Sequence, residues 1–352
     1  MAVPLLMQHA YTQRLAHRRD DFQLGMYELG VPRPKSATYA DCIVVFTYSG
    51  DIEVSKLSLD MARKGIRLVR IDSDRADETC LDGIDREGRL LVGNEVLAPR
   101  LIWKRHFLAS RTVPEESRKT IDYAYAQMQA IEGVVHADGT TAINGRVRDP
   151  SLTGQLSMAE RAGMRIPKSV ISNDPQHAIA EIRPSSKMIV KSLGSHWVQE
   201  SPDTFLGTFP KALDVSRFET VPLEPVPVLF QEYVPHDSET RTYVIGGEII
   251  SYEISGKRSA SQIWDRPSSV NVRPMALPER TLEQVRLLQR LMRFDYGAID
   301  LLHAETGEYV FLEVNLDGDW NYFEEHAGAG PEVRQAVARY LETRIARRKP
   351  LT

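Results

Sequence analysis

The sequence predicts a mixed α/β protein, with a parallel sheet near its N-terminus and antiparallel strands toward its C-terminus. Cys42–Thr47 is a short apolar run, as in a strand buried on both faces, and it is followed by the amphipathic segment Val54–Lys64 and by Ile66–Ile71. A strand–helix–strand unit of this kind predicts a right-handed parallel crossover. Further along, two strand-like runs flank the Gly246-Gly247 turn, and Gly297–His326 repeats the pattern of strand, turn and strand.

The composition indicates an ordinary globular protein and excludes several classes of function. The 352 residues carry a net charge of −4, so no overall positive field would draw the chain to nucleic acid or to an anionic membrane. No signal-peptide pattern and no apolar run of about 18 residues occurs, which predicts that the chain has no membrane partner. Cys42 and Cys80 are the only cysteines and lack metal-binding spacing, which fits a reducing cytoplasm.

The first 145 residues divide into an arm and a domain. Residues 1–40 are interpreted as a flexible or surface-packed extension, and residues 41–145 form the first predicted domain. Within it, the strand Leu101–Trp103 is followed by the basic triplet Lys104–His106, at the carboxyl end where open α/β sheets bind ligands. Ligand binding and simple capping of the strand by solvated charges both stay open. The amphipathic run Pro114–Ile131 predicts a helix.

The remainder of the chain alternates short strands with helices. Helices are expected at Leu152–Ala162, Leu282–Met292 and Glu332–Arg347, and strands at Ser169–Ser172, Lys187–Lys191, Leu229–Val234, Thr242–Ile245 and Glu248–Ile254. Asp174 is expected to cap a short helix. The segment Ser255–Pro274 is polar and irregular, which predicts a loop near a site.

The ribbon Gly297–His326 carries three hard oxygen donors. Asp300 lies in its first strand, and Glu313 and Asn315 lie at the end of its second. In a two-stranded ribbon these side chains can converge on one face. Two carboxylates and an amide oxygen suit Mg²⁺, which is usually completed by substrate phosphates. Taken alone, the pattern fits equally well with acidic residues that flank an ordinary hairpin.

Polar groups upstream of this ribbon occur in the order that a nucleotide site requires. They are, in chain order, Lys191, the hinge Gln231–Val234, Glu239, Arg241, Asn271 and Arg273. An enzyme that activates a carboxylate with ATP needs a cation on the phosphates, backbone hydrogen bonds for adenine, an acid for the ribose and arginines on the transferred phosphoryl group. Each residue alone is more simply a surface charge, so the order carries the prediction.

The motifs FQEYVP, ETR, NVR, GAIDLL and FLEVN, behind a strand that ends in Lys191, occur in an order that resembles the ATP-grasp superfamily of carboxylate–amine ligases. Within that superfamily, Phe311–Asn315 and Gly318…Trp320 are most similar to the graspetide synthetases, microviridin-type ω-ester peptide ligases. The resemblance covers roughly residues 41–330. It implies an ATP-grasp fold with a pre-ATP-grasp domain at 41–145, a central lid domain at 146–235 and a C-terminal antiparallel-sheet catalytic domain at 236–352.

The resemblance also implies roles for single residues and for ATP and Mg²⁺ as cofactors. For the nucleotide, Lys191 would bind the α/β-phosphates, Glu232 and Val234 would contact adenine through their backbone, and Glu239 would bind the ribose. For the chemistry, Arg241 and Arg273 would face the γ-phosphate and the acyl-phosphate. Asp300, Glu313 and Asn315 would be the Mg²⁺ ligands. The loop Ser192–Trp197 would cover the phosphates.

The sequence departs from the family pattern at three places. Many ATP-grasp enzymes have a lysine early in the helix before the lid, but here that helix starts at Leu152 without one, and Arg146 or Arg148 could stand in. Where the resembled family has Pro-Asn-Gly-Gln-Trp after the asparagine, this chain has Leu316–Trp320, Leu-Asp-Gly-Asp-Trp, which adds two negative charges. The N-terminal arm lies outside the pattern.

The implied reaction is phosphorylation by ATP of an Asp or Glu side chain in a ribosomally made precursor peptide. A Ser or Thr hydroxyl or a Lys amine of the same peptide would then attack the acyl-phosphate and close an ester or amide ring. The resemblance further implies a homodimer. Two alternatives stay open, which are a ligase that adds a free amino acid to a carboxyl terminus and a nucleotide-binding regulator without ligase chemistry.

Overall fold

The computed structural model describes residues 37–74, 81–86, 88–92, 95–107, 142–194, 197–201, 204–207, 210–217, 226–257 and 270–346. The chain splits into two compact units, one of residues 1–145 and 341–352 and the other of residues 146–340. Most of the arm 1–40 and the expected helix Pro114–Ile131 lie outside the described residues. Among the described helices, none is long and apolar enough to cross a bilayer.

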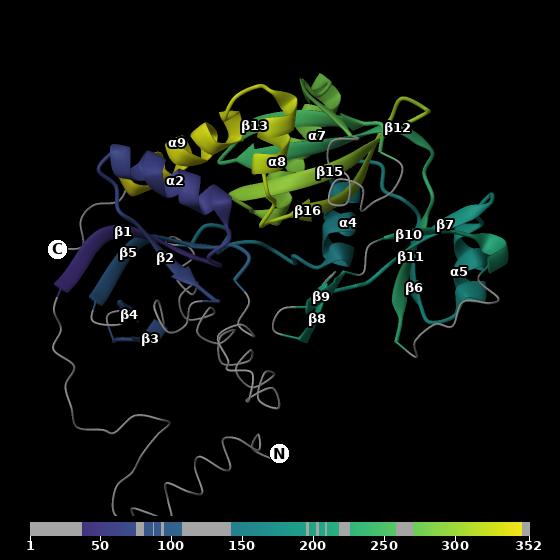
Figure 1. Ribbon diagram of the computed structural model, residues 1–352. Helices are drawn as coiled ribbons and strands as arrows, with labels where there is room; N and C mark the ends of the chain where they lie inside the picture. The colour runs from purple at the N-terminus through teal and green to yellow at the C-terminus, as the bar shows by residue number, and fades with distance from the viewer. Residues whose placement is uncertain are drawn as a thin grey trace, which may run out of the picture. The chain divides into compact units, whose positions relative to one another are not determined.

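The first unit is built on a sheet with the strand order β2-β1-β5-β4-β3 (Figure 1). Its elements are β1 (Ala37–Thr47), α2 (Ile52–Arg63), β2 (Leu68–Asp72), β3 (Leu81–Ile84), β4 (Leu90–Val92) and β5 (Glu95–Lys104). β1 pairs in parallel with β2 and with β5. The unit β1–α2–β2 is the parallel crossover that the apolar run and the amphipathic segment predict. β1 begins at Ala37, inside the segment that the sequence assigns to the arm.

The basic triplet after β5 has a structural explanation at its centre. Arg105 is fully buried and forms ion pairs with Asp51 and Glu53, which lie at the start of α2. Asp51 also caps α2 by accepting from the Val54 N–H at 3.0 Å. Arg105 is therefore neither a solvated strand cap nor exposed to a ligand, because it ties the end of β5 to α2.

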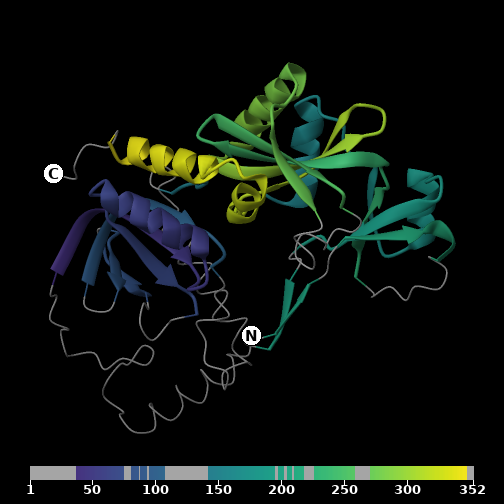
Figure 2. The same cartoon turned by 45° about the horizontal axis from the view of Figure 1, so that its top comes forward.

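The second unit contains two antiparallel sheets and their helices (Figure 1). The helix α4 (Leu152–Arg161) precedes the four-stranded sheet β10-β7-β11-β6. The strands of this sheet are β6 (Ser169–Ser172), β7 (Lys187–Lys191), β10 (Lys211–Asp214) and β11 (Val228–Glu232), and the chain between them forms α5 (Pro175–Ile182) and the 3₁₀ turn η3 (Val215–Arg217). β8 (Trp197–Ser201) and β9 (Thr204–Gly207) form a separate ribbon that projects from this sheet, as Figure 2 shows.

The five-stranded sheet has the order β14-β13-β12-β15-β16. Its strands are β12 (His236–Ile245), β13 (Glu248–Ser255), β14 (Asn271–Met275), β15 (Tyr296–Ala304) and β16 (Tyr309–Asn315), and the helices of this part of the chain are α7 (Glu279–Met292) and α8 (Asn321–Ala327). The last helix, α9 (Glu332–Ala346), begins in this unit, and its residues from Leu341 onward belong to the first unit. One face, named here the α4/α7 face, packs residues such as Val244, Ile299 and Phe311 against Leu156 of α4 and Leu288 of α7. The opposite face is named the carboxylate face, after the acids described below.

One expectation about this sheet is wrong. The segment Ser255–Pro274 was expected to be irregular throughout, but Asn271–Met275 forms the edge strand β14, which pairs with β13. Val270 and Val272 are buried while Asn271 and Arg273 are exposed, which is the two-residue period of a half-buried strand. Pro274 obscures this short pattern in the sequence, although an edge strand tolerates proline.

Candidate active site

The carboxylate face brings an arginine and two acids into one row across three strands. Arg241 of β12 lies opposite Asp300 of β15, and Asp300 lies opposite Glu313 of β16. Register partners on adjacent strands project their side chains to the same face. Glu239 precedes Arg241 by two residues on β12 and therefore points to the same side. The pairing of β12 with β15 and of β15 with β16 therefore gathers these four side chains on one face.

Arg241 is held on this face by charge and by aromatic rings. Its Nη1 donates to both Asp300 oxygens, at 2.9 and 2.7 Å, and its guanidinium carbon lies 5.8 Å from the centre of the Tyr243 ring and 5.5 Å from that of Phe323 in α8. Burial would lower the pKa of Arg241, but the charges and hydrogen bonds of Asp300 and Tyr243 together outweigh burial and raise that pKa above its usual range. Its Nε has no hydrogen-bond partner among the described residues. Arg241 is thus a permanently charged group whose Nε–H is buried without a partner in the described part of the chain.

The four-stranded sheet contributes Lys191, which ends β7 and is buried with 6% exposure. Burial lowers the pKa of Lys191, and the charges of Glu313, Asp300 and Glu239 act in the opposite direction. Because those three acids belong to the five-stranded sheet, the two sheets of this unit face each other at this point. A buried ammonium beside several carboxylates is an arrangement that favours an anionic ligand together with a cation.

Glu239 accepts a hydrogen bond from Lys257, whose Nζ lies 2.6 Å from its Oε2, and its Oε1 lies 3.7 Å from His236 Nε2. Burial would raise the pKa of Glu239, but these two partners lower it overall, and the hydrogen bond to Glu239 raises the pKa of His236. Glu239 is therefore an ionised acceptor, which suits a sugar hydroxyl.

The hinge between the two sheets is partly apolar. Val234 is buried in a cluster with Leu302, Ala304 and Val310, and Leu302 is the register partner of Glu239. The Val234 carbonyl accepts a hydrogen bond from His236 Nδ1 at 2.8 Å. The Glu232 N–H donates to the Lys168 carbonyl at 2.8 Å, which ties the hinge to the segment before β6. An apolar patch next to a hinge backbone and an acid is the surrounding that a purine and its ribose need.

The loop after β16 is held by two buried tyrosines. Tyr296 donates to the Gly318 carbonyl and Tyr243 to the Asp319 carbonyl. A Cβ on Gly318 would lie 2.8 Å from Arg241 Nη2 and would also collide with Ala298, so only glycine fits beside Arg241. The loop that departs from the family pattern therefore packs directly on the guanidinium.

The third oxygen donor is placed beside the other two, since Asn315 pairs with Ala298, two residues from Asp300 on the same face. Asn315 is exposed, and its Oδ1 accepts from the Asp317 N–H at 3.0 Å. Among the described residues, no group of three His, Cys, Asp or Glu side chains is arranged to hold a metal. The donors that do converge, Asp300, Glu313 and Asn315, are oxygen ligands of the kind that Mg²⁺ takes when a substrate supplies the remainder.

A buried glutamine fixes the backbone between Glu313 and Asn315. Gln155 of α4 accepts from the Val314 N–H at 2.7 Å and donates to the Val314 carbonyl at 3.1 Å. It thereby satisfies the outer edge of β16 as another strand would. Its role was missed, although a polar residue within the apolar stripe of a helix is a signal for such a buried contact.

Lys257 was also missed, although the hairpin around Gly246-Gly247 offered a signal. Its register pairs Glu239 with Ile254, so a lysine three residues further on falls near Glu239.

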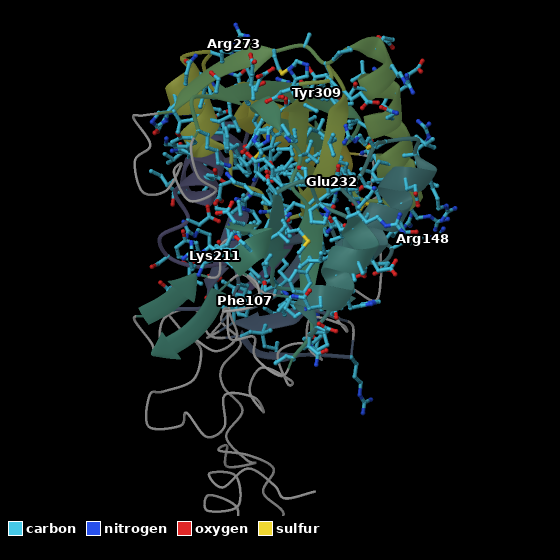
Figure 3. The ribbon with its side chains drawn as sticks, turned by 90° about the vertical axis from the view of Figure 1, so that its right-hand side faces the viewer. Phe107, Arg148, Lys211, Glu232, Arg273 and Tyr309 are labelled. Carbon is cyan, nitrogen blue, oxygen red and sulfur yellow. The ribbon has the colours of Figure 1, made fainter. Side chains whose placement is uncertain are left out.

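The structure does not bring Arg273 to the other predicted site residues. Arg273 pairs with Glu253, which lies opposite Thr240, so all three belong to the α4/α7 face. Its side chain is 67% exposed and forms an ion pair with Glu253. Figure 3 shows Arg273 at the periphery of the molecule, away from the hinge residue Glu232. Arg148, offered as a substitute for the missing lysine, also lies at the surface in that view, and Arg146 is exposed.

Comparisons with known proteins bear on the fold. A scan of protein-family models found no match, and neither did a search of curated proteins. Solved structures do match. The macrocyclase MdnC of Microcystis aeruginosa MRC, bound to precursor peptide MdnA, is similar at 21% identity and a TM-score of 0.67, over 86% of this chain and 99% of that chain.

Two further structures show the range of the likeness. The ATP-grasp ligase PsnB, complexed with a precursor variant, Mg and ADP, is similar at 18% identity and a TM-score of 0.67, over 87% of this chain and 99% of that chain. The D-cycloserine synthetase DcsG is similar at 14% identity and a TM-score of 0.57, over 86% of this chain and 99% of that chain. These similarities confirm the ATP-grasp fold expected from the sequence, and they leave the reaction to be argued from the site.

Proposed function

We propose that this chain is an ATP-dependent ligase that acts on a peptide carboxylate. The observation that carries the proposal is the convergence of Lys191, Glu239, Arg241, Asp300 and Glu313 between the two sheets of one unit. The similarity to MdnC and PsnB, whose structures contain precursor peptides, supports a peptide as the acceptor of the phosphoryl group.

In this proposal the nucleotide lies between the two sheets. Glu232 and Val234 would meet adenine through their backbone, Glu239 would accept from the ribose hydroxyls and Lys191 would bind the α/β-phosphates. Asp300, Glu313 and Asn315 would hold Mg²⁺, which when bound neutralises charge on the phosphates. Arg241 would bind the transferred phosphoryl group, because its guanidinium lies beside Asp300 in the row of metal-binding carboxylates.

The proposed chemistry has two steps. A peptide Asp or Glu carboxylate attacks the γ-phosphorus of ATP, the bond to the β-phosphate oxygen breaks, and ADP leaves. A Ser or Thr hydroxyl or a Lys amine of the same peptide then attacks the acyl carbon, phosphate leaves with the C–O bond electrons, and the nucleophile loses its proton. Arg241 would stabilise the charge on the transferred phosphoryl group in both steps, and no nucleophile on the protein is required.

Mass spectrometry tests the proposal directly. The chain is co-expressed with a candidate precursor peptide that contains Asp or Glu and Ser, Thr or Lys, and the loss of one water per new bond is the expected result. A gain of one amino-acid residue would instead support the alternative ligase, which adds a free amino acid to a carboxyl terminus. An unchanged peptide together with intact nucleotide binding would favour the regulator. An Asp300→Asn variant that still closes the ring would contradict the role given to the carboxylate row.

We further propose that the chain acts as a homodimer, as the resemblance implies. Light scattering during size-exclusion chromatography measures the molar mass directly. A mass of about 40 kDa, that of one chain, would contradict this proposal.

A further inference from the structure

Two short stretches of chain join the two sheets of the second unit. Residues 165–168 lead into β6 of the four-stranded sheet, and residues 232–236 lead from β11 into β12 of the five-stranded sheet. Each stretch contains a proline, Pro167 or Pro235, whose fixed φ limits how the chain can bend. A hinge needs only a few such positions, so the angle between the two sheets is set at these stretches.

Arg165 belongs to the five-stranded sheet through its main chain. Its carbonyl accepts from the Phe311 N–H of β16 at 2.8 Å, and it forms an isolated bridge with Val310. Three residues later the chain has joined the other sheet, because the Lys168 carbonyl accepts from the Glu232 N–H of β11 at 2.8 Å. Arg165 and Glu232 therefore lie on opposite sides of the hinge.

The side chain of Arg165 crosses this hinge. Its Nη2 lies 3.5 Å from Glu232 Oε1, and its Nη1 donates at 3.0 Å to Oε2 of Glu308, in the turn between β15 and β16. The other Glu232 oxygen accepts from the Lys168 N–H at 3.2 Å, so the Glu232 carboxylate contacts the first stretch at both of its ends. The Arg165 and Glu232 side chains are 33% and 28% exposed, so water weakens their attraction without abolishing it.

We propose that Arg165 is a positioning residue that holds the two sheets at the angle that the nucleotide requires. Glu308 keeps the guanidinium on the five-stranded sheet, and Glu232 reaches it from the four-stranded sheet. The strand that ends at Glu232 pairs with β7, which ends at Lys191, so a change of angle would move the proposed adenine and phosphate contacts together. This inference rests on the nucleotide site of the proposed function and gives the Glu232 side chain a role besides that of its backbone.

Hydrogen exchange measured by mass spectrometry tests the hinge in the full chain without nucleotide. Arg165→Met should speed exchange in β11 and β16 about three- to fivefold, because the Glu232 and Phe311 N–H groups would open more often. Arg286→Met is the matched control, because it removes an exposed ion pair with Glu279 within α7, away from the hinge. The two variants should melt within about 3 °C of each other, since both lose only exposed ion pairs.

Calorimetry with Mg²⁺ and AMPPNP tests the consequence for the nucleotide site. Arg165→Met and Glu232→Gln should each weaken AMPPNP binding about three- to fivefold, the upper range for a partly exposed ion pair. Glu232→Gln keeps an acceptor for the Lys168 N–H and loses only the charge. Because both changes remove the same contact, the double variant should bind AMPPNP within about twofold of either single variant.

Three outcomes decide the matter. Exchange rates and AMPPNP binding in Arg165→Met equal to those of Arg286→Met would overturn the proposal. Losses that multiply in the double variant would overturn it too, because Arg165 and Glu232 would then act separately. A chain that binds neither AMPPNP nor ADP, but in which Arg165→Met speeds exchange as expected, would overturn the proposed function and not the contact across the hinge.

Discussion

The five-stranded sheet carries an arginine–carboxylate pair on each of its faces, and the two pairs differ in everything except their chemistry. On the carboxylate face, Arg241 and Asp300 are 11% and 26% exposed, with rings of Tyr243 and Phe323 around the guanidinium. On the α4/α7 face, Arg273 is 67% exposed beside Glu253. The first pair lies next to Lys191 and Glu313, whereas the second lines an open cleft of about 280 Å³ with His303 and Tyr309.

Register produces this difference. Thr240, Glu253 and Arg273 occupy one row across three strands, and Arg241, Asp300 and Glu313 occupy the next row, one residue along β12. A shift of one residue would exchange the faces. An arginine in a motif therefore reaches a site only if its position along the strand directs its side chain to the face that carries the site. Burial then decides how much its charge contributes to stability and binding.

The largest difference between the two arginine–carboxylate pairs is expected when the buried arginine, Arg241, is removed. Arg241→Met should lower turnover roughly a hundredfold to a thousandfold, because a preorganised charge on the transferred group would be lost. It should also cost about 2–4 kcal/mol of unfolding free energy, since Asp300 would stay beside Glu313 without its partner. Peptide modification followed by mass spectrometry measures the first effect and urea unfolding the second. A turnover within threefold of the original chain would contradict the role of Arg241.

The sequence predicts that Asp300 and Glu313 lie near each other because both belong to one hairpin, whose strands are joined by a four-residue turn. A β-bulge between Asp300 and Leu301 then makes Glu313 the register partner of Asp300, and the sequence shows no sign of this bulge. The end of β7 at Lys191 was expected for a similar reason, since a strand pattern stops there. The fold class was confirmed because the order of the motifs is a property of the whole chain.

The sequence could not place Arg273 for the opposite reason. Residues 256–270 separate β13 from β14, so no turn fixes their register and the parity of Arg273 cannot be read from the sequence. Gln155 was missed on different grounds. Its partner is the backbone of Val314, far along the chain, and a buried amide can be interpreted only when its partner is known.

The second prediction concerns Gln155, which holds the backbone of Val314 between two of the predicted Mg²⁺ ligands. Gln155→Leu would leave the Val314 N–H and carbonyl without their partners, which should cost about 2–4 kcal/mol of unfolding free energy. Because Val314 lies between Glu313 and Asn315, the Mg²⁺ concentration for half-maximal activity should rise about three- to tenfold. Gln155→Glu separates the two contacts, because it keeps the acceptor for the Val314 N–H but loses the donor to the Val314 and Pro150 carbonyls and adds a buried charge beside them. An unchanged Mg²⁺ requirement in a folded Gln155→Leu would show that Gln155 serves stability alone.

The third prediction tests the loop against the guanidinium. Gly318→Ala places a methyl group against Ala298 and Arg241 Nη2, so either the loop or the arginine must shift. We expect about 1–3 kcal/mol of destabilisation and about a tenfold loss of kcat, with AMPPNP affinity nearly unchanged because the adenine and ribose contacts lie elsewhere. Gly307→Ala in the β15–β16 turn is a control without a nearby atom for its methyl group, although its positive φ adds strain. A parallel loss of AMPPNP affinity in Gly318→Ala would place the damage at the nucleotide rather than at Arg241.

The smallest effect is expected at Arg273, and it decides whether the two faces differ in function as they do in exposure. The motif order assigns Arg273 to the transferred phosphoryl group, whereas the register places it on the α4/α7 face as an exposed ion pair. Exposed ion pairs contribute little to stability, so Arg273→Met should leave the unfolding transition nearly unchanged and should change kcat by less than about twofold. The measurement is the same peptide assay, with Arg241→Met run beside it. A loss of kcat comparable to that of Arg241→Met would mean that β14 changes its register or moves when substrate binds, because the structure offers Arg273 no path through the sheet to the carboxylate face.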